Sequence, residues 1–462
     1  MKNTRARSFV VYLLSIFFLL GLGFFVFSYF KDGRDWVAHP GNQHLSQDGQ
    51  LLSAGKIFDR NGVVLAETSD GARIYHQDIA TRRALLHTIG DNTRFISTAV
   101  QNVWRSELIG YNPLTGISLN SAGRTGNDLT LTIHSSACRI AQELFGGRKG
   151  AISVYNYKTG ELLCMVSSPN YDPQNRPNIE EDETGAYDGV YLNRVLSSSY
   201  TPGSVFKVIT AAAAIENIPN LYERTFTCPG YVEVEGEKIT CMSQHGEINF
   251  EDGFAQSCNV VFAELALELG KEKMTATAEK MGFGDSFTID RIPTAKSSYD
   301  VSEADAVDLG WSGIGQYTDL VNPAHLMILM GAVANGGVPV EPYLVEKVTT
   351  PIGLPLQYGS AGSGERLCSA STAEKLTGLM RHAVTTNYGE ALFPGLTVCA
   401  KTGTAEVGNG QNPHAWMIGF TLDEDCPLAF SCVVENSGHG FPVAGPILAG
   451  VLEELAQDMR GE

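Results

Sequence analysis

The chain has 462 residues, of which 43% are hydrophobic, so it is long enough for more than one domain and for a large core. Its formal net charge of −18 argues against a nucleic-acid partner, because phosphates are bound by basic surfaces.

The N-terminal region predicts a membrane anchor. Residues 8–30 form an apolar run without a charge, long enough to cross a bilayer. Lys2, Arg5 and Arg7 precede it, so the positive-inside rule places residues 1–7 in the cytoplasm and the remaining chain outside. A cleavable signal peptide is the alternative, but the run is longer than an h-region and no A-x-A site follows it. We therefore expect a single-pass protein of the plasma membrane.

Residues 31–127 predict a small pedestal or interaction domain. Lys56 to Leu65, turning at Asn61-Gly62, has the pattern of a β-hairpin, and Phe95 to Leu108 has helical character. No cluster of acid, base and nucleophile stands out here. A supporting role, such as a dimerisation-like module, is therefore the expectation for this segment.

Residues 128–462 predict a second, larger domain. Leu129, Leu131 and Ile133 alternate as in a strand. Further strands are expected at 151–157, 161–166, 399–405, 415–420 and 428–434, and helices at 137–145, 205–215, 260–269, 323–334 and 447–459. Strands at both ends with helices between them predict an antiparallel sheet closed by the two ends of the domain, with a helical lobe inserted. The expected fold class is α+β.

Ser204 and Lys207 predict a nucleophile and a base. Thr201 is expected to cap the helix, so Ser204 falls in its first turn and shares a face with Lys207. Burial lowers a lysine pKa, and a fall of roughly 3 units, costing about 4 kcal/mol, is enough for a base near neutral pH. The alternative is a core helix with one snorkelling lysine, since about one Ser-x-x-Lys match is expected by chance and Ser53 to Lys56 also fits.

Ser257 and Asn259 form a second motif. Its hydroxyl is suited to relay a proton toward a leaving amine, and its amide to hold a substrate amide. An N-cap before the helix that begins near Val260 explains the same residues equally well.

Lys401-Thr402-Gly403-Thr404 forms a third motif on a predicted strand. The glycine lets a ligand backbone approach, while the lysine and threonines offer donors to a carboxylate. An ordinary exposed strand is the alternative, and Lys158-Thr159-Gly160 repeats the tripeptide in a turn. Only the three motifs at 204, 257 and 401 occur in the order helix start, loop and strand.

These motifs in this order resemble those of the penicillin-binding proteins and serine β-lactamases. Gly160 to Pro173, Leu192 to Arg194 and Gly403 to Glu406 also resemble the transpeptidase domain of class B penicillin-binding proteins. The resemblance covers residues 128–462. Gly55 to Gly62 resembles the entry motif of the family's pedestal, with Ala54 where the family usually has arginine.

The resemblance implies a bacterial peptidoglycan D,D-transpeptidase that forms an acyl-enzyme with stem peptides and is acylated by β-lactams. It implies that the N–H groups of Ser204 and Thr404 hold the oxyanion. It implies neither a metal nor an organic cofactor. It assigns catalytic roles to Ser204, Lys207 and Ser257, and substrate-binding roles to Asn259, Lys401, Thr402, Gly403 and Thr404.

The resemblance to class B proteins also implies a protein partner, and other functions remain as alternatives to transpeptidation. Fewer than 100 residues separate the anchor from residue 128, too few for the glycosyltransferase domain of bifunctional members. Monofunctional relatives work with a membrane glycan polymerase of the shape, division or sporulation type, so such a partner is expected. A serine β-lactamase, a D,D-carboxypeptidase, a β-lactam sensor and a non-catalytic scaffold are the alternatives. A sensor needs a cytoplasmic output domain, and only about seven residues precede the anchor.

The nine cysteines are an odd number for an exported domain, so at least one is free or pairs between chains. Cys228 and Cys241 flank a turn-like stretch, which favours a disulfide between them or two buried thiols. Cys258 and Cys399 are expected to be buried as small apolar side chains near the site.

Overall fold

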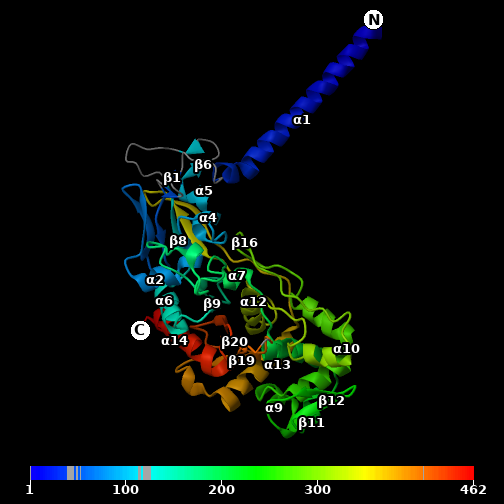
Figure 1. The fold of residues 1–462 in the computed structure, drawn as a ribbon. Coiled ribbons are helices and arrows are strands. Elements are labelled where there is room, and N and C mark those ends of the chain that lie inside the picture. The colour runs from blue at the N-terminus through cyan, green and yellow to red at the C-terminus, as the bar shows by residue number, and fades with distance from the viewer. Residues whose placement is uncertain are drawn as a thin grey trace.

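The computed structural model describes residues 2–38, 46–47, 50–51, 54–112, 116–117, 126–408 and 410–461. The Ser53 end of the second Ser-x-x-Lys match lies outside these ranges. Figure 1 shows three parts in a row: a projecting N-terminal helix, a body around two sheets, and a lobe built mainly of helices.

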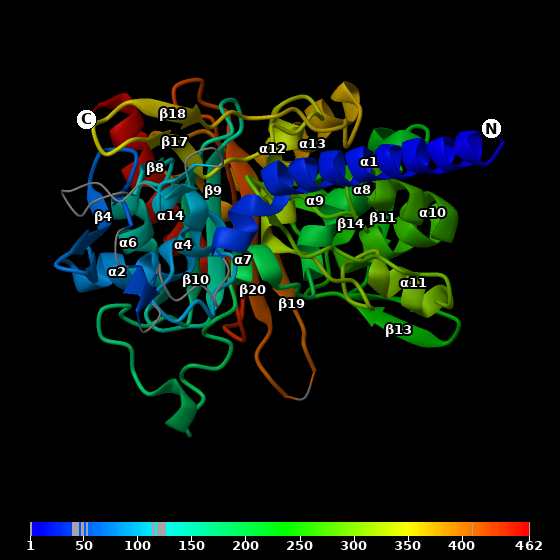
Figure 2. The same ribbon diagram turned by 90° about the horizontal axis from the view of Figure 1, so that it is seen from above.

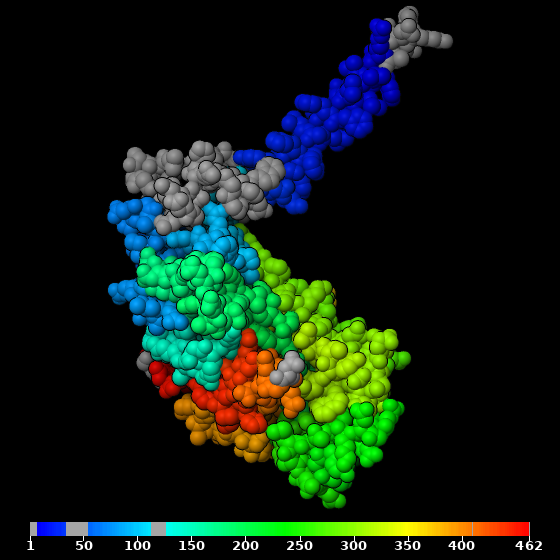
Figure 3. Space-filling model, viewed as in Figure 1, coloured from blue at the N-terminus to red at the C-terminus, as the bar shows by residue number. Residues whose placement is uncertain are grey.

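Helix α1 (Lys2–Ala38) projects away from the body, and Figure 3 shows it surrounded by open space. Within it, Arg7–Gly33 has a mean hydropathy of 2.6 and none of its apolar window is buried by the protein. In the described part of the chain it is the one helix long and apolar enough to cross a membrane. The predicted span 8–30 lies inside it, which fits a membrane-anchored protein.

A six-stranded sheet with the strand order β18-β17-β8-β3-β4-β5 lies next to α1. The predicted hairpin is confirmed, because β3 and β4 are antiparallel and Gly62 has a φ of 79°. The helix expected over 95–108 is two one-turn helices that meet at Trp104, α4 (Val100–Val103) and α5 (Arg105–Leu108). The strands are β3 (Ile57–Phe58), β4 (Val64–Ser69), β5 (Ala72–Tyr75), β8 (Asp128–Leu131), β17 (Val345–Thr349) and β18 (Pro355–Tyr358).

Strand β8 joins this sheet through both of its edges. It is parallel to β3 on one side and antiparallel to β17 on the other. The sheet thus combines strands from both sides of residue 128, and the domain boundary at 127 and 128 stays a prediction.

A five-stranded antiparallel sheet with the order β10-β9-β21-β20-β19 forms the centre of the molecule. Strand β9 pairs along its whole length with β21, so strands near the two ends of residues 128–462 meet in one antiparallel sheet, as predicted. The first expected strand, around Leu129, lies instead in the six-stranded sheet as β8. Every residue of β9, β10 and β21 is buried, which explains their continuous apolar sequences. The strands are β9 (Gly150–Asn156), β10 (Leu162–Ser168), β19 (Val398–Ala405), β20 (His414–Thr421) and β21 (Leu428–Val434).

Helices cover this sheet on both faces. On one face α6 (Ser135–Phe145) packs against α14 (Gly440–Arg460), and Figure 2 shows the two together at one side of the strands. Helix α12 (Pro323–Ala334), which is buried almost all round, packs against β9, β20 and β21. Helix α14 begins seven residues earlier than expected and continues through Pro446.

The helical lobe lies on the far side of the sheet from the pedestal strands in both ribbon views (Figures 1 and 2). Helix α10 continues eleven residues beyond the predicted end at Leu269, across a kink at Gly270. Two short two-stranded sheets, β11–β14 and the hairpin β12–β13 that lies between them in the chain, complete the lobe. Its helices are α8 (Lys207–Asn217), α9 (Phe250–Ala255), α10 (Asn259–Lys280), α11 (Ala306–Ser312) and α13 (Ala370–Ala383), and its strands β11 (Thr225–Cys228), β12 (Tyr231–Val234), β13 (Glu237–Thr240) and β14 (Gly246–Asn249).

Candidate active site

Ser204 lies in a single 3₁₀ turn, Gly203–Phe206, that leads directly into α8. The expectation that Thr201 caps this helix is wrong. The N-cap position is Pro202, and no side chain caps the turn. The turn is held instead by the backbone bond from Gly203 N to Gly315 O, at 2.9 Å, and Thr201 offers its carbonyl to Trp416 Nε1.

Gly203 brings this turn into direct contact with β19. Its φ is +54°, a conformation that favours glycine, and a Cβ there would lie 2.7 Å from Thr404 O and 2.9 Å from Ala405 Cα. A Cβ on Gly403 would in turn lie 2.9 Å from Pro202 O. The first and third sequence motifs therefore touch through backbone alone.

Lys207 is completely buried at the start of α8. Its Nζ lies 2.6 Å from Ser257 O, 2.7 Å from Asn259 Oδ1 and 3.1 Å from Ser257 Oγ. Burial lowers the pKa of Lys207 well below its ordinary value, and the positive charge of Lys401 lowers it further. A neutral amine has two N–H bonds and one lone pair, which suits two carbonyl acceptors and one hydroxyl donor.

Lys401, on β19, is also fully buried and points to the same hydroxyl. Its Nζ donates to Ser257 Oγ at 2.9 Å and to Thr402 O at 3.0 Å. Burial lowers the pKa of Lys401 to about 7. The Ser257 hydroxyl thus accepts a bond from Lys401 and has its own proton available for the lone pair of Lys207.

The capping explanation for the second motif does not hold. Helix α10 begins at Asn259, and Cys258 occupies the N-cap position without a side-chain cap bond. The Asn259 amide instead bonds Lys207 through Oδ1 and donates from Nδ2 to Thr240 O at 2.8 Å. Ser257 has a φ of +57°, which is uncommon for a residue other than glycine.

The rest of the third motif lies along the same edge. Thr402 donates from its N–H and Oγ1 to Tyr388 Oη, at 3.1 and 3.0 Å. The Gly440 N–H points to Thr404 Oγ1 at 3.4 Å. Ser204 is partly exposed, and its hydroxyl makes no hydrogen bond to any residue that the structure describes. All eight predicted site residues belong to segments that meet here: Ser204, Lys207, Ser257, Asn259, Lys401, Thr402, Gly403 and Thr404.

Sequence reasoning missed two residues that support this edge. Tyr388 ends the turn that follows α13, and its ring stacks on Phe441 at 5.4 Å between centroids. Trp416 is buried on β20 beside Thr201. Neither lies in a motif, and an apolar aromatic residue near a strand looks the same in sequence whether it supports a site or a core.

Comparison with known proteins gives the family. The family model for the penicillin-binding protein transpeptidase domain matches residues 150–453. Peptidoglycan D,D-transpeptidase PbpA of Mycolicibacterium smegmatis is 30% identical over 322 residues, which are 66% of this chain and 65% of that protein. The protein of the same name from Mycobacterium tuberculosis strain H37Rv is 30% identical over 340 residues, 69% of each chain.

The fold agrees with these matches. The structure of penicillin-binding protein A from M. tuberculosis as a ceftriaxone acyl-enzyme complex superposes with a TM-score of 0.77 and 26% identity, covering 88% of this chain and 98% of that one. The D,D-transpeptidase domain of a peptidoglycan glycosyltransferase from Eggerthella lenta superposes with a TM-score of 0.75 and 26% identity, covering 89% and 99%. The chain therefore belongs to the penicillin-binding protein transpeptidase family and is of its class B type.

Proposed function

We propose that this protein is a membrane-anchored peptidoglycan D,D-transpeptidase that cross-links stem peptides through an acyl-enzyme on Ser204. The observation that carries the proposal is the Ser257 hydroxyl, which lies 3.1 Å from Lys207 Nζ and 2.9 Å from Lys401 Nζ. A buried neutral amine one helical turn after the serine, with a second cation bonded to the same Ser257 hydroxyl, suits proton transfer and carboxylate binding at one place.

Acylation begins when Ser204 Oγ attacks the carbonyl carbon of the penultimate D-alanine. Its proton passes to Lys207, and the N–H groups of Ser204 and Thr404 hold the oxyanion. The bond to the terminal D-alanine then breaks, and the leaving amine receives a proton relayed by Ser257 from Lys207. Deacylation reverses the order: the amine of a second stem peptide attacks the ester, the new amide forms, and Ser204 regains its proton.

Binding falls to the residues that face the substrate. Lys401, Thr402 and Thr404 hold the terminal carboxylate, and Gly403 lets the peptide backbone approach β19. Asn259 holds an amide of the donor peptide. In the structure the Oδ1 of Asn259 accepts a bond from Lys207. The proposed role therefore requires the Asn259 side chain to bond the substrate in addition to Lys207.

The anchor and the partner are part of the proposal. Helix α1 holds the protein in the plasma membrane as a single span, with the catalytic domain outside. Labelling of intact cells with a membrane-impermeant reagent tests this, because an engineered cysteine in residues 2–6 should be protected and one at Gly353 should react.

A membrane glycan polymerase is the proposed partner. Co-purification of the full-length protein from membranes in mild detergent should recover such a polymerase. Replacing residues 7–33 by an unrelated membrane helix should reduce that recovery; no polymerase with the unaltered protein would contradict the partnership.

Turnover of a synthetic D-Ala-D-Ala peptide tests the activity. With a second peptide that offers a free amine, a transpeptidase forms the amide between the two peptides and releases D-alanine. Release of D-alanine with only the hydrolysed product would identify a carboxypeptidase. No release at all from correctly folded protein would leave the scaffold alternative.

A further inference from the structure

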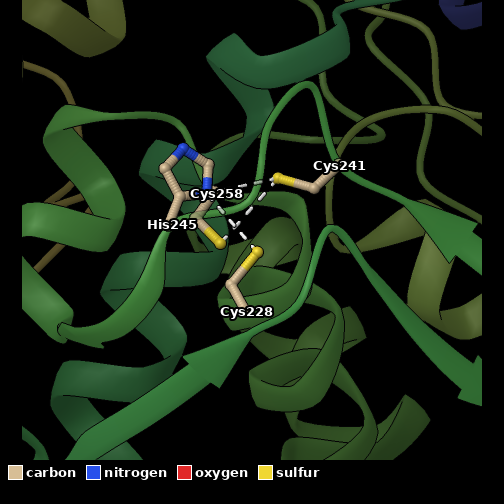
Figure 4. Close-up of side chains that lie close together, drawn as sticks. All are labelled: Cys228, Cys241, His245 and Cys258. Carbon is tan, nitrogen blue, oxygen red and sulfur yellow. Dashed lines mark hydrogen bonds between the residues drawn. The ribbon is translucent and has the colours of Figure 1, made fainter.

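Three cysteines and one histidine converge in the helical lobe, directly behind the second motif. Cys228 ends β11, Cys241 follows β13, His245 precedes β14, and Cys258 is the middle residue of Ser257-Cys258-Asn259. Their Sγ and Nδ1 atoms all lie within 4.8 Å of one another. Figure 4 shows the three thiols and the imidazole turned toward a common centre.

Three of the distances between these atoms are close to the edge lengths of a tetrahedral metal site. The Sγ atoms of Cys241 and Cys258 are 3.9 Å apart, and His245 Nδ1 lies 3.4 Å from Cys228 Sγ and 3.6 Å from Cys241 Sγ. A tetrahedral zinc ion, with Zn–S bonds of about 2.3 Å and Zn–N bonds of about 2.0 Å, sets neighbouring ligand atoms about 3.5 to 3.8 Å apart.

A disulfide does not explain the cluster. The sequence left two alternatives for Cys228 and Cys241, a disulfide or two buried thiols, because they flank a turn-like stretch. Both are free thiols in the structure, Cys228 buried and Cys241 half-buried, so the disulfide alternative is wrong. The fold adds His245, which follows Cys241 by 4 residues, and Cys258, which follows it by 17. The spacing of Cys241 and His245 was a signal that the sequence reasoning did not use.

The surroundings supply the contacts that a metal-bound set requires. His245 Nε2 lies 3.1 Å from Ser243 Oγ, which fixes Nδ1 as the nitrogen free to bind a metal. The backbone N–H of Asn259 donates to Cys241 Sγ at 3.2 Å, a bond that stabilises a thiolate. Cys228 and Cys258 are fully buried, so the four protein ligands leave no open position for a substrate.

We propose that Cys228, Cys241, His245 and Cys258 form a structural zinc site that fixes the Ser257–Asn259 segment of the active site. Three thiolates and one imidazole in a closed tetrahedron are a set that zinc prefers. The proposed metal is not part of the acyl-transfer chemistry. The resemblance implied no metal, so a zinc ion here departs from that expectation. The metal holds the residues on either side of Cys258, both of which bond Lys207.

Two features of the lobe explain why a bound metal would stabilise it. The sheets β11–β14 and β12–β13 have only two strands each, and isolated two-stranded sheets are marginally stable in water. Ser257 is held with a φ of +57°, a conformation that surrounding structure must impose. A metal bound to the next residue, Cys258, supplies that constraint. Through Cys228 and Cys241 it also links both two-stranded sheets to the start of α10.

Metal analysis of the full-length protein in detergent tests the site independently of its activity. Elemental mass spectrometry should find about one zinc per chain. Cys228→Ser and His245→Ala should lose most of it, whereas Cys426→Ser, at a buried cysteine outside the cluster, should keep it. Protein without zinc even after incubation with zinc salts, protein loaded only with iron, or unchanged zinc in the two ligand variants would overturn the assignment.

Cobalt substitution keeps the test valid if the ligand variants fail to fold. Wild-type protein stripped by a chelator and reloaded with Co²⁺ should show the intense visible bands of tetrahedral cobalt together with thiolate charge-transfer absorption. Weak bands of octahedral cobalt, or no thiolate absorption, would contradict three thiolate ligands.

The effect on the active site rests on the proposed function and has its own readout. Zinc-free protein should be acylated by a penicillin at least about tenfold more slowly, and added zinc should restore the rate. Ser204→Ala should lose acylation and keep its zinc, which separates failure of the proposed function from failure of the metal site. Equal acylation rates with and without zinc would show that the metal does not hold the second motif.

Discussion

Lys207, on α8, and Lys401, on β19, direct their amino groups at one hydroxyl, that of Ser257, at 3.1 and 2.9 Å. Two ammonium groups this close would repel each other, and burial disfavours the charge on both. The arrangement is best satisfied when Lys207 is neutral and Lys401 carries the charge. The two lysines then have the different tasks that acyl transfer requires of a base and a carboxylate-binding cation.

Replacing Lys207 should remove the base and leave the nucleophile in place. We expect Lys207→Ala to lower the second-order rate of acylation by a penicillin about 10²- to 10⁴-fold, the usual contribution of a positioned general base. Stopped-flow measurement with a fluorescent penicillin gives this rate. Acylation within a factor of about three of wild type would mean that another group takes the proton.

Replacing Lys401 should mainly weaken substrate binding. Lys401→Ala removes the buried cation that faces the carboxylate, so the dissociation constant of the non-covalent penicillin complex should rise about tenfold or more. Lys158→Ala is a matched control, because Lys158 begins the second copy of the tripeptide and bonds Asn335 on the exposed surface. Equal losses in the two variants would contradict a role for the third motif.

Substituting Gly203 should separate the nucleophile turn from β19. In Gly203→Ala the new Cβ meets the backbone of Thr404 and Ala405 and also carries the cost of a positive φ, so acylation should slow at least about tenfold. Gly62→Ala is the matched control. Gly62 has a φ of 79°, but no atom lies within 4 Å of a Cβ added there, so this variant has the conformational cost without the clash. Normal acylation in Gly203→Ala would show that the turn tolerates displacement.

Buried His325 should make the fold less stable at mildly acidic pH. Burial lowers its pKa to about 4, and the neutral ring bonds Ser297 Oγ and Met281 O. Because the folded pKa lies below the unfolded value of about 6.5, the contribution is complete above pH 6.5 and is lost as the pH falls toward 4, by at most about 3 kcal/mol.

Denaturant unfolding between pH 7 and pH 5 measures this contribution. His325→Gln should lower the stability at pH 7 and flatten its decline with falling pH, whereas His439→Gln, at an exposed position, should change neither. An unchanged decline in His325→Gln would assign the acid sensitivity to other groups, such as His87, whose pKa burial also lowers to about 4.

The sequence predicted elements best where local pattern and packing agree. The predicted bounds 323–334 and 428–434 match α12 and β21, because both segments are apolar runs. Helix α12 has a clear start at the Asn322 cap and Pro323. Strand β21 is buried and paired with β9 along its whole length. The three motifs also meet in space, through the bonds of Lys207 and Lys401 to Ser257, while their roles in catalysis stay predictions.

What the sequence did not predict depends on contacts between distant segments. The pairing of β8 with β3 and β17 cannot be read from its alternating residues, since the partner strand at each of its edges lies far along the chain. The position of Tyr388 beside Thr402, and the convergence of the three cysteines with His245, likewise depend on contacts between distant segments. Cys258 was expected to be a buried apolar side chain, and the fold places Cys228, Cys241 and His245 beside it.

Intact-protein mass spectrometry with a penicillin tests the central claim most directly. Wild-type protein should gain the mass of one penicillin on Ser204 and keep it for hours, while Ser204→Ala gains none. An adduct lost within seconds would identify a β-lactamase instead of a transpeptidase. An adduct on Ser204→Ala, or none on folded wild-type protein, would contradict Ser204 as the nucleophile.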